Sequence, residues 1–320
     1  MNENRSPVGM IGLGIMGSAM SANLMRAGHR VIGYDLLAGR RRNHRQAGGD
    51  IGRTCLEVGS RAQIIVCSLP SSEALLQTAV ELAKVSRRGA PARLPRSVTR
   101  RSPPRVVLET STLPIVVKER ARRILRARGT ILLDCPLSGT GAQARAKDLV
   151  VYASGDRGAY RRTIQIFEAF ARAHYYVGAF GAGSKTKFVA NLLVAIHNVA
   201  AAEALALAMK AGLDPAMALK VIGDGAGSSR MLQVRGPMMV KGDYSDATMK
   251  LEVWQKDMTI IADFARELGC PTPLFAACAP FYTAAIAMGR GAEDTAAVCA
   301  VLEEMAGVNR ARTRKVKVRK

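Results

Sequence analysis

The sequence predicts an α/β fold, with an N-terminal domain built on a parallel sheet and an all-α domain that starts with a long helix. Three observations predict this fold. Short apolar runs alternate with helical patterns through the first 180 residues, as in successive βαβ units. A glycine-rich turn joins the first apolar run to the first helical pattern. From residue 184 to residue 211 the chain is rich in Ala, Leu and Val, and the pattern stays helical from there on.

The first βαβ unit occupies about thirty residues. Residues 7–12 form an apolar run that ends at glycine, and residues 18–27 carry apolar and small side chains at three- and four-residue steps. Gly28 stands where a helix C-cap is expected. Residues 31–35 then read as the second strand, which is the spacing of a parallel crossover unit.

The same alternation predicts the later elements of the first domain. Residues 62–70 form a near-continuous apolar run, as expected for a strand buried on both faces. Ser71 or Ser72 is the expected cap of the next helix. Residues 115–127 have a helical pattern. Further strands are expected at 106–109, 131–134, 149–153 and 175–177.

The change from alternating strand and helix patterns to a continuous helical pattern places a domain boundary near residues 180–184. We expect a dinucleotide-binding domain at 1–182, an all-helical substrate and dimerisation domain at 183–308, and a disordered basic tail at 309–320. Residues 86–105 are rich in Arg and Pro and read as an irregular insert. The apolar stretch 188–209 contains Asn, His and Glu, which are costly in lipid, so it predicts a buried helix and no membrane association.

The net charge of +22 raises the question whether the protein binds nucleic acid. Residues 86–105 and 309–320 each carry seven basic side chains and no acidic one, so these two segments account for fourteen of the positive charges. No aromatic residues alternate with them, so stacking on bases has no support. The distribution therefore makes nucleic acid an unexpected partner, although loose binding to polyanions fits it.

The cysteines and histidines indicate which compartment and which metal chemistry the sequence supports. The six cysteines include no C-x-x-C pair, which is typical of reduced thiols in a cytoplasmic protein. The four histidines have no metal-binding spacing, so no metal site is expected. No secretion signal is visible at the N-terminus.

The turn at residues 12–17 has the pattern G-x-G-x-x-G between a strand and a helix, which indicates a Rossmann-type dinucleotide site. Gly12 permits the tight turn, Gly14 lets the backbone approach a pyrophosphate, and Gly17 lets helix and strand pack closely. The helix N-terminus supplies N–H groups and partial positive charge. The cofactor-binding residues expected in this turn are Gly12, Leu13, Gly14, Ile15, Met16 and Gly17.

Asp35 ends the second strand, eighteen residues after Gly17. A carboxylate there can accept hydrogen bonds from ribose hydroxyls and repels a 2′-phosphate, so it favours NAD over NADP. The alternative is a solvated acid at a strand end. Nearby arginines at 40–42 and 45 offset the preference, so NADP remains the second candidate cofactor.

Two further segments are candidates for substrate chemistry. Lys187 and Asn191 are four residues apart, so they share one face of a helix that starts after a glycine-rich hinge. A lysine there can exchange a proton with a substrate, although the spacing alone favours an ordinary exposed lysine near a helix start. The loop after the strand at 131–134 contains Ser138, Gly139 and Thr140, and it is either a carboxylate site or a plain turn.

Together these segments resemble the β-hydroxyacid dehydrogenases, which include 3-hydroxyisobutyrate dehydrogenase and tartronate semialdehyde reductase, within the 6-phosphogluconate dehydrogenase group. The resemblance lies in six stretches that occur in the family's order and span nearly the whole chain. They are residues 8–17, 69–72, 109–112, 134–139, 181–191 and 256–257.

The resemblance implies a role for each matching residue. Lys187 would be the catalytic acid/base with Asn191 beside it, and residues 138–140 would hold the substrate carboxylate. It also implies that Leu69, Pro70 and Thr112 line the cofactor site and that Lys256 reaches the cofactor from the helical domain. The implied reaction is hydride transfer between a nicotinamide cofactor and a short β-hydroxy acid or its semialdehyde. A homo-oligomer, dimer or tetramer, is implied as well.

Departures from the family pattern leave alternatives open. Thr140 stands where the family usually has a second glycine, and the 86–105 insert and the basic tail lie outside the pattern. One alternative is an imine reductase of the same architecture, which usually lacks the lysine found at 187. Another is a non-catalytic protein that uses its nucleotide domain to bind nucleic acid or chromatin. The identity of the hydroxy acid does not follow from the sequence.

Overall fold

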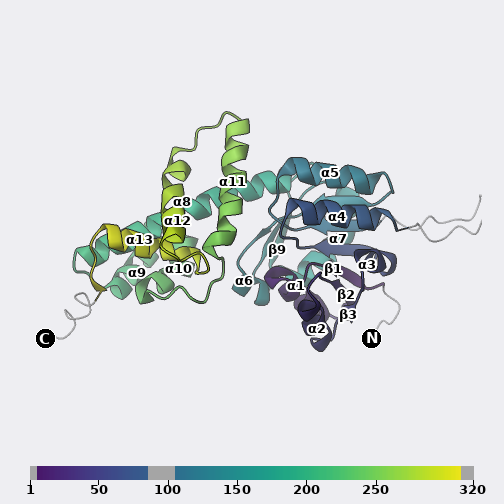
Figure 1. The fold of residues 1–320 in the computed structure, drawn as a ribbon, viewed down its shortest axis with the longest axis horizontal. Coiled ribbons are helices and arrows are strands. Elements are labelled where there is room, and N and C mark those ends of the chain that lie inside the picture. Colours follow the sequence, from purple (N-terminus) through teal and green to yellow (C-terminus); the bar gives the residue numbers. More distant parts are fainter. Residues whose placement is uncertain (1–5, 86–104, 311–320) are drawn as a thin grey trace, which may run out of the picture. The chain divides into compact units, whose positions relative to one another are not determined.

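The structure is a computed structural model that describes residues 6–85 and 105–310 (Figure 1). The chain folds as two compact units, Met1–Lys187 and Phe188–Lys320. The domain boundary expected at 182/183 falls at the start of α8 (Ala182–Lys210), the helix that passes from one unit into the other. Of the 86–105 insert only Arg105 is described, and its Nε donates to the carbonyl of Ala62 at 3.2 Å.

A six-stranded parallel sheet forms the centre of the N-terminal unit, in the order β3-β2-β1-β4-β5-β6. Its strands are β1 (Val8–Ile11), β2 (Val31–Tyr34), β3 (Asp50–Ile51), β4 (Ile64–Cys67), β5 (Val106–Glu109) and β6 (Ile131–Asp134). The direction of strand order reverses between β1 and β4, which creates a switch point at the carboxyl ends of the strands. The predicted parallel α/β sheet is confirmed.

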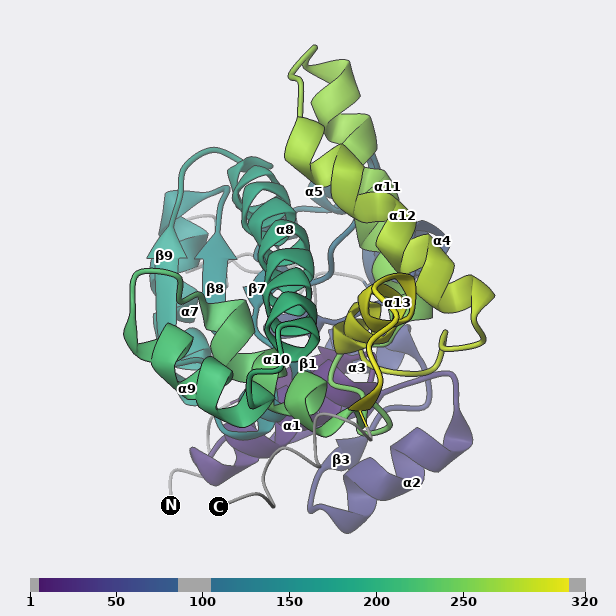
Figure 2. The ribbon, with the colours of Figure 1, turned by 90° about the vertical axis from the view of Figure 1, so that its left-hand side faces the viewer.

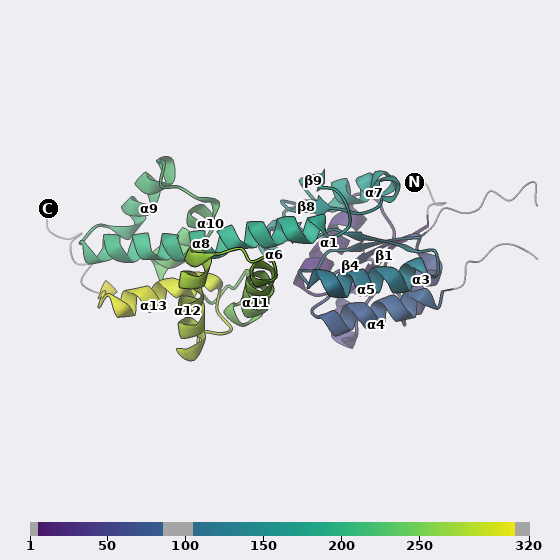
Figure 3. The same cartoon turned by 90° about the horizontal axis from the view of Figure 1, so that it is seen from above.

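Helices cover both faces of this sheet, as Figure 3 shows for α7 on one side and α4 and α5 on the other. Successive strand residues alternate between two cores: Met10 packs toward α1 and α7, and Ile11 packs toward α3, α4 and α5. The helices are α1 (Ile15–Arg26), α2 (Ala38–Gln46), α3 (Cys55–Arg61), α4 (Ser72–Ala83), α5 (Ile115–Arg126) and α7 (Arg157–Phe170). Ser71 caps α4 through its hydroxyl, which accepts from the N–H of Ala74.

A second, three-stranded sheet completes the N-terminal unit. Its strands are β7 (Leu137–Ser138), β8 (Val150–Ala153) and β9 (Ala173–Tyr176), which lie side by side in Figure 2. The short helix α6 (Gly141–Arg145) follows β7. The strands expected at 149–153 and 175–177 are thus present, but they belong to a separate sheet that the sequence did not predict.

The C-terminal unit is all helical, as predicted. Its elements are α8, α9 (Pro215–Asp224), α10 (Arg230–Lys241), α11 (Leu251–Glu267), α12 (Pro273–Ala287), the short 3-10 helix η1 (Thr295–Ala297) and α13 (Val298–Met305). Asn198 of α8 is buried and donates to the Tyr282 hydroxyl and to the carbonyl of Thr295. By length and composition α8 is apolar enough to cross a membrane, but half of its most apolar window is buried in the protein, as in a core helix.

The end of the described chain is anchored rather than loose. The guanidinium of Arg310 donates to the carbonyls of Met239 and Val240 and to the carboxylate of Glu303. Of the basic tail expected at 309–320, the structure describes only residues 309 and 310, so the expected disorder stays a prediction. Residues 311–320 lie outside the described residues.

Candidate active site

The glycine turn lies between β1 and α1, and two of its glycines leave no room for a side chain. Gly12 has φ +89°, and a Cβ there would lie 2.1 Å from the carbonyl oxygen of Ser68. A Cβ on Gly17 would lie 1.9 Å from the carbonyl oxygen of Gly12. The roles predicted for Gly12 in a tight turn and Gly17 in close packing are confirmed.

The third glycine faces open space instead of the protein. A Cβ on Gly14 would meet only Arg40 Nη1, at 3.8 Å. Gly14 is the N-cap of α1, and within this described helix no side chain caps the N-terminus and no acidic residue lies in the first turn. Backbone N–H groups and partial positive charge are thus left for an anion. Along the same turn Leu13 is buried, Ile15 is exposed and Met16 packs against the core.

Asp35 follows β2 and is held against the glycine turn. Its Oδ2 accepts from the backbone N–H of Leu13 at 2.8 Å, and its Oδ1 accepts from the N–H of Leu37 at 2.9 Å. Arg40 Nη1 lies 3.3 Å from Oδ2, and Arg41 donates to the backbone oxygen of Asp35. Each carboxylate oxygen has two lone pairs, so the group still has acceptor capacity for a ribose hydroxyl.

The loops after β4 and β5 carry the other expected cofactor contacts of this unit. Leu69 is half-buried and its N–H donates to the hydroxyl of Ser111 at 2.8 Å, which ties the two loops together. Pro70 is exposed, and Thr112 is half-buried in the neighbouring loop. Both loops lie at the carboxyl ends of neighbouring strands, β4 next to β1 and β5 next to β4, and ligands of such sheets bind at this edge.

The loop of residues 138–140 turns from β7 into α6. Gly139 has φ +136°, a conformation that favours glycine. Thr140 is the N-cap of α6: its Oγ1 accepts from the N–H of Gln143, and its own N–H donates to Gln143 Oε1 at 3.0 Å. This capping box occupies the Thr140 N–H, whereas the Thr140 hydroxyl acts in it only as an acceptor and keeps its own proton to donate. The groups left to the loop for an anion are the hydroxyls of Ser138 and Thr140 and the Gly139 backbone.

Lys187 and Asn191 lie one turn apart on α8, as predicted. Asn191 is buried, and its Nδ2 donates to Asp257 Oδ2 at 3.0 Å. Lys256 Nζ lies 3.3 Å from the other oxygen of the same carboxylate. The structure therefore brings Asn191 and Lys256 together on Asp257, a residue that stands out in the sequence only as part of a stretch that matches the family.

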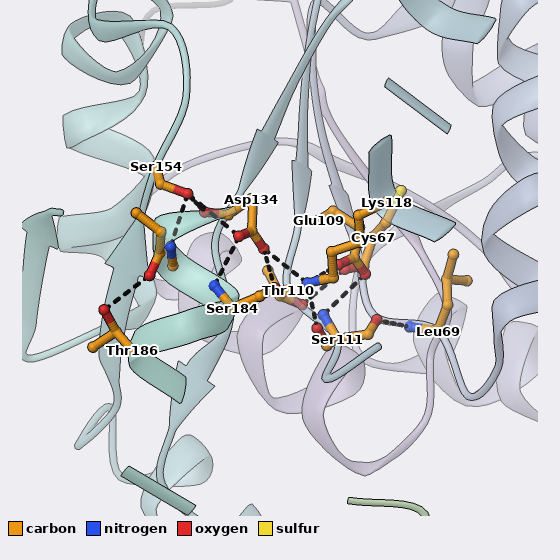
Figure 4. A network of polar contacts seen from close by, with 12 residues as sticks. Cys67, Leu69, Glu109, Thr110, Ser111, Lys118, Asp134, Ser154, Ser184 and Thr186 are labelled. Atoms are coloured by element: carbon orange, nitrogen blue, oxygen red, sulfur yellow. Dashed lines mark hydrogen bonds and ion pairs between the residues drawn. The ribbon is translucent and has the colours of Figure 1, made fainter. Parts of the chain in front are cut away.

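Sequence reasoning missed a buried ion cluster beneath the site (Figure 4). Lys118 of α5 is fully buried, with Nζ 2.6 Å from Glu109 Oε2 and 2.8 Å from Asp134 Oδ1. Burial lowers the pKa of Lys118, but the two carboxylates outweigh burial and raise the pKa above its ordinary value. The ammonium is therefore charged at neutral pH. No local signal marks Lys118 for burial, because its contacts come from two strands and a loop that are distant in sequence.

The comparisons with known proteins agree with this geometry. Residues 7–178 match the family described as the NAD binding domain of 6-phosphogluconate dehydrogenase. Residues 181–302 match the family described as NAD-binding of NADP-dependent 3-hydroxyisobutyrate dehydrogenase. The chain belongs to the β-hydroxyacid dehydrogenase family. It is an oxidoreductase that uses NAD(P) and acts on a CH–OH group.

Individual relatives of this dehydrogenase cover nearly its whole length. It is 34% identical to L-threonate dehydrogenase of Cupriavidus necator, over 91% of this chain and 94% of the relative. It is 29% identical to 2-hydroxy-3-oxopropionate reductase of Escherichia coli, over 93% and 98%. The crystal structure of 3-hydroxyisobutyrate dehydrogenase from Salmonella typhimurium superposes with a TM-score of 0.78 at 28% identity, over 93% of this chain and all of that one.

Proposed function

We propose that this dehydrogenase oxidises a short β-hydroxy acid, or reduces the matching semialdehyde, with Lys187 as acid/base. The observation that carries the proposal is the Lys187–Asn191 pair on α8, with the Asn191 amide fixed by Asp257 at 3.0 Å. Two relatives are named L-threonate dehydrogenase and 2-hydroxy-3-oxopropionate reductase. These names support a small hydroxy acid with further oxygen groups as the substrate.

The residues of the glycine turn fit a dinucleotide. The open space at Gly14 and the uncapped start of α1 would accept the pyrophosphate, in the turn of Gly12, Leu13, Gly14, Ile15, Met16 and Gly17. Asp35 would accept ribose hydroxyls, so we propose NAD as the preferred cofactor. Leu69, Pro70, Thr112 and Lys256 would complete the cofactor site. When bound, the nicotinamide supplies the hydride acceptor or donor.

Lys187 performs the proton transfer in this proposal. In the direction of oxidation, the neutral amine of Lys187 takes the proton from the substrate hydroxyl as the carbonyl forms; in reduction, its ammonium returns the proton to the alkoxide oxygen. Asn191 is held so that its Nδ2 donates to Asp257, which turns its carbonyl oxygen away from that carboxylate. The Asn191 carbonyl oxygen can then accept a hydrogen bond from Lys187, and the second Nδ2 proton can donate to the oxygen of the substrate hydroxyl.

The substrate carboxylate is assigned to the loop of Ser138, Gly139 and Thr140. The Ser138 hydroxyl, the Gly139 N–H and the Thr140 hydroxyl proton make the direct contacts in this proposal, and Thr140 also shapes the loop through its capping box with Gln143. Gly139 favours this role because its φ of +136° orients the peptide in a way that most residues resist.

We further propose a cytoplasmic homo-oligomer, a dimer or a tetramer. All six cysteines are free thiols, which suits a reducing compartment. Met217 and Val221 of α9 are 57% and 62% exposed, as expected for a face that another subunit covers. Light scattering behind a sizing column measures the assembly directly.

The test of the proposed function is a substrate panel with NAD(H) and NADP(H) assayed separately. The panel contains L-threonate, 3-hydroxyisobutyrate, 2-hydroxy-3-oxopropionate and, as a negative control, a cyclic imine. Turnover of a hydroxy acid or semialdehyde, faster with NAD(H), is expected. Reduction of the imine alone would contradict the proposal and favour the imine reductase alternative.

A further inference from the structure

The first turn of α8 is fastened to the end of β6 by one buried carboxylate (Figure 4). Asp134 Oδ2 accepts from the backbone N–H of Ser184 at 2.8 Å, and Oδ1 accepts from the Ser184 hydroxyl at 2.8 Å. The preceding N–H, of Gly183, donates to Ser154 Oγ at 3.0 Å, and that hydroxyl donates to the backbone oxygen of Asp134. All these groups are buried and belong to the N-terminal unit.

The carboxylate that holds α8 is itself held by Lys118. The ammonium of Lys118 contacts Asp134 Oδ1 and also donates to the carbonyl of Ser111 at 2.7 Å. Ser111 in turn accepts from the N–H of Leu69. One chain of contacts therefore joins the loops after β4 and β5, which carry the proposed cofactor contacts, to the start of α8.

Packing around the first turn of α8 is equally restrictive. A Cβ on Gly183 would lie 2.4 Å from the carbonyl of Tyr152 and 2.7 Å from the carbonyl of Asp134, so the helix approaches the strand ends without a side chain between them. The negative charge of Asp134 also lies at the positive end of the helix dipole. The position and rotation of this turn are thus fixed by both hydrogen bonds and sterics.

We propose that Asp134, kept in place by Lys118, is a positioning residue that sets the direction of the Lys187 side chain through Ser184. Ser184 is three residues before Lys187, so the two lie on neighbouring turns of one helix face. Each residue advances an α-helix by about 1.5 Å and rotates it by about 100°, so a small slip of the first turn redirects Lys187. Displacements of about 1 Å at a reacting group can cost about a hundredfold in rate.

This inference rests on the proposed role of Lys187, and its test uses the full-length enzyme. Ser184→Ala removes the hydroxyl contact and keeps the backbone contact to Asp134. We expect a decrease in kcat of about tenfold with KM for NAD and for the substrate nearly unchanged, because binding groups stay in place and only the proton-transfer group shifts. The limb of the pH–rate profile that Lys187 controls should move in the same variant.

The matched control is Thr186→Ala, two residues along the same helix. The Thr186 hydroxyl donates to the carbonyl of Ala182 at 2.9 Å and does not touch Asp134. This variant should keep the kcat and pH profile of the natural enzyme. Equal kcat and equal pH profiles for Ser184→Ala and Thr186→Ala would overturn the inference.

A double-mutant cycle decides whether Ser184 acts through Lys187. In single-turnover measurements, Ser184→Ala should have no further effect once Lys187 has been replaced by alanine. If the two losses multiply, Ser184 acts independently and the inference is wrong, while the proposed function stands. If Lys187→Ala alone keeps the natural rate, the proposed function fails, and the positioning role fails with it.

Discussion

The carboxylate of Asp35 accepts a hydrogen bond of 2.8 Å from the backbone N–H of Leu13. The acid at the end of β2 and the second residue of the glycine turn are thus one structural unit. Arg40 pairs with the same carboxylate at 3.3 Å. One of the arginines that offset the NAD preference in the sequence therefore contacts Asp35 itself. Asp35 holds the glycine turn, and in the proposed cofactor site it would also select the cofactor.

Replacing Asp35 by alanine should change cofactor preference. Loss of the carboxylate removes the ribose acceptor and frees Arg40 to pair with a 2′-phosphate. We expect KM for NAD to rise by about tenfold or more, and the ratio of kcat/KM for NADP to that for NAD to rise, as steady-state assays with both cofactors would measure. The control is Asp50→Ala, because Asp50 pairs with the exposed side chains of Arg30 and Arg61. Unchanged preference in Asp35→Ala would contradict this role.

Gly17→Ala should damage both stability and cofactor binding. The new Cβ would lie 1.9 Å from the carbonyl oxygen of Gly12, so backbone must move to admit it. We expect the free energy of unfolding to fall by about 1–3 kcal/mol, as in other overpacked sites, together with weaker binding of NADH in a fluorescence titration. In Gly223→Ala the Cβ meets nothing within 4 Å inside α9, so this control should leave stability unchanged or slightly raised. Equal stability of the two variants would refute the packing argument.

His44 should make stability depend on pH. The His44 ring packs tightly against Gly49, so that a Cβ added to Gly49 would lie only 2.1 Å from His44 Nε2. Burial lowers the pKa of His44 below its ordinary value of 6.5. The unfolded chain then binds the proton more readily than the folded chain, so stability falls as pH drops below about 6.5 toward the lowered pKa. Urea unfolding at pH 7.5 and 5.5 measures this decrease.

A variant separates His44 from other titrating groups in that experiment. His44→Gln should lose part of the decrease in stability between pH 7.5 and 5.5, whereas His197→Gln in the C-terminal unit should retain it. An identical decrease in all three proteins would show that the proton is taken up elsewhere.

Lys118→Met should be among the most destabilising changes in the N-terminal unit. It leaves Glu109 and Asp134, both fully buried, without the ammonium between them. Breaking a buried ion pair on one side costs about 3–5 kcal/mol, which denaturant unfolding would detect. Lys84→Met is the matched control, because the Lys84–Glu81 pair is exposed and such pairs contribute about 0–1 kcal/mol. A loss for Lys118→Met no larger than for the control would contradict the assigned role of the cluster.

The difference between Lys118 and the glycine turn shows how far the sequence could predict this protein. The turn is local: Gly12 and Gly17 are five residues apart, and the flanking strand and helix follow from apolar periodicity. The ion cluster joins residues of β5, α5, β6 and α8 that are up to 75 positions apart in the sequence, so no pattern along the chain reveals it.

The loop at 138–140 lies between these cases. From the sequence alone its serine and glycine fit either a carboxylate site or a plain turn. The hydrogen bond from the Thr140 N–H to Gln143 Oε1 was not predicted, although Thr and Gln three residues apart are a known capping signal. The three-stranded sheet was missed for a different reason: β7 is only two residues long, too short for alternation to be seen.

The most direct test of the account is turnover by Lys187→Ala, with Lys185→Ala as a control from the same turn of α8. Rapid-mixing measurements of NADH at 340 nm, with a saturating substrate from the panel, would give the rate. We expect NADH to bind Lys187→Ala with natural affinity while kcat falls by about 10²–10⁴-fold, the usual contribution of a general acid/base. Near-natural turnover by Lys187→Ala would contradict the central claim that this lysine carries the proton.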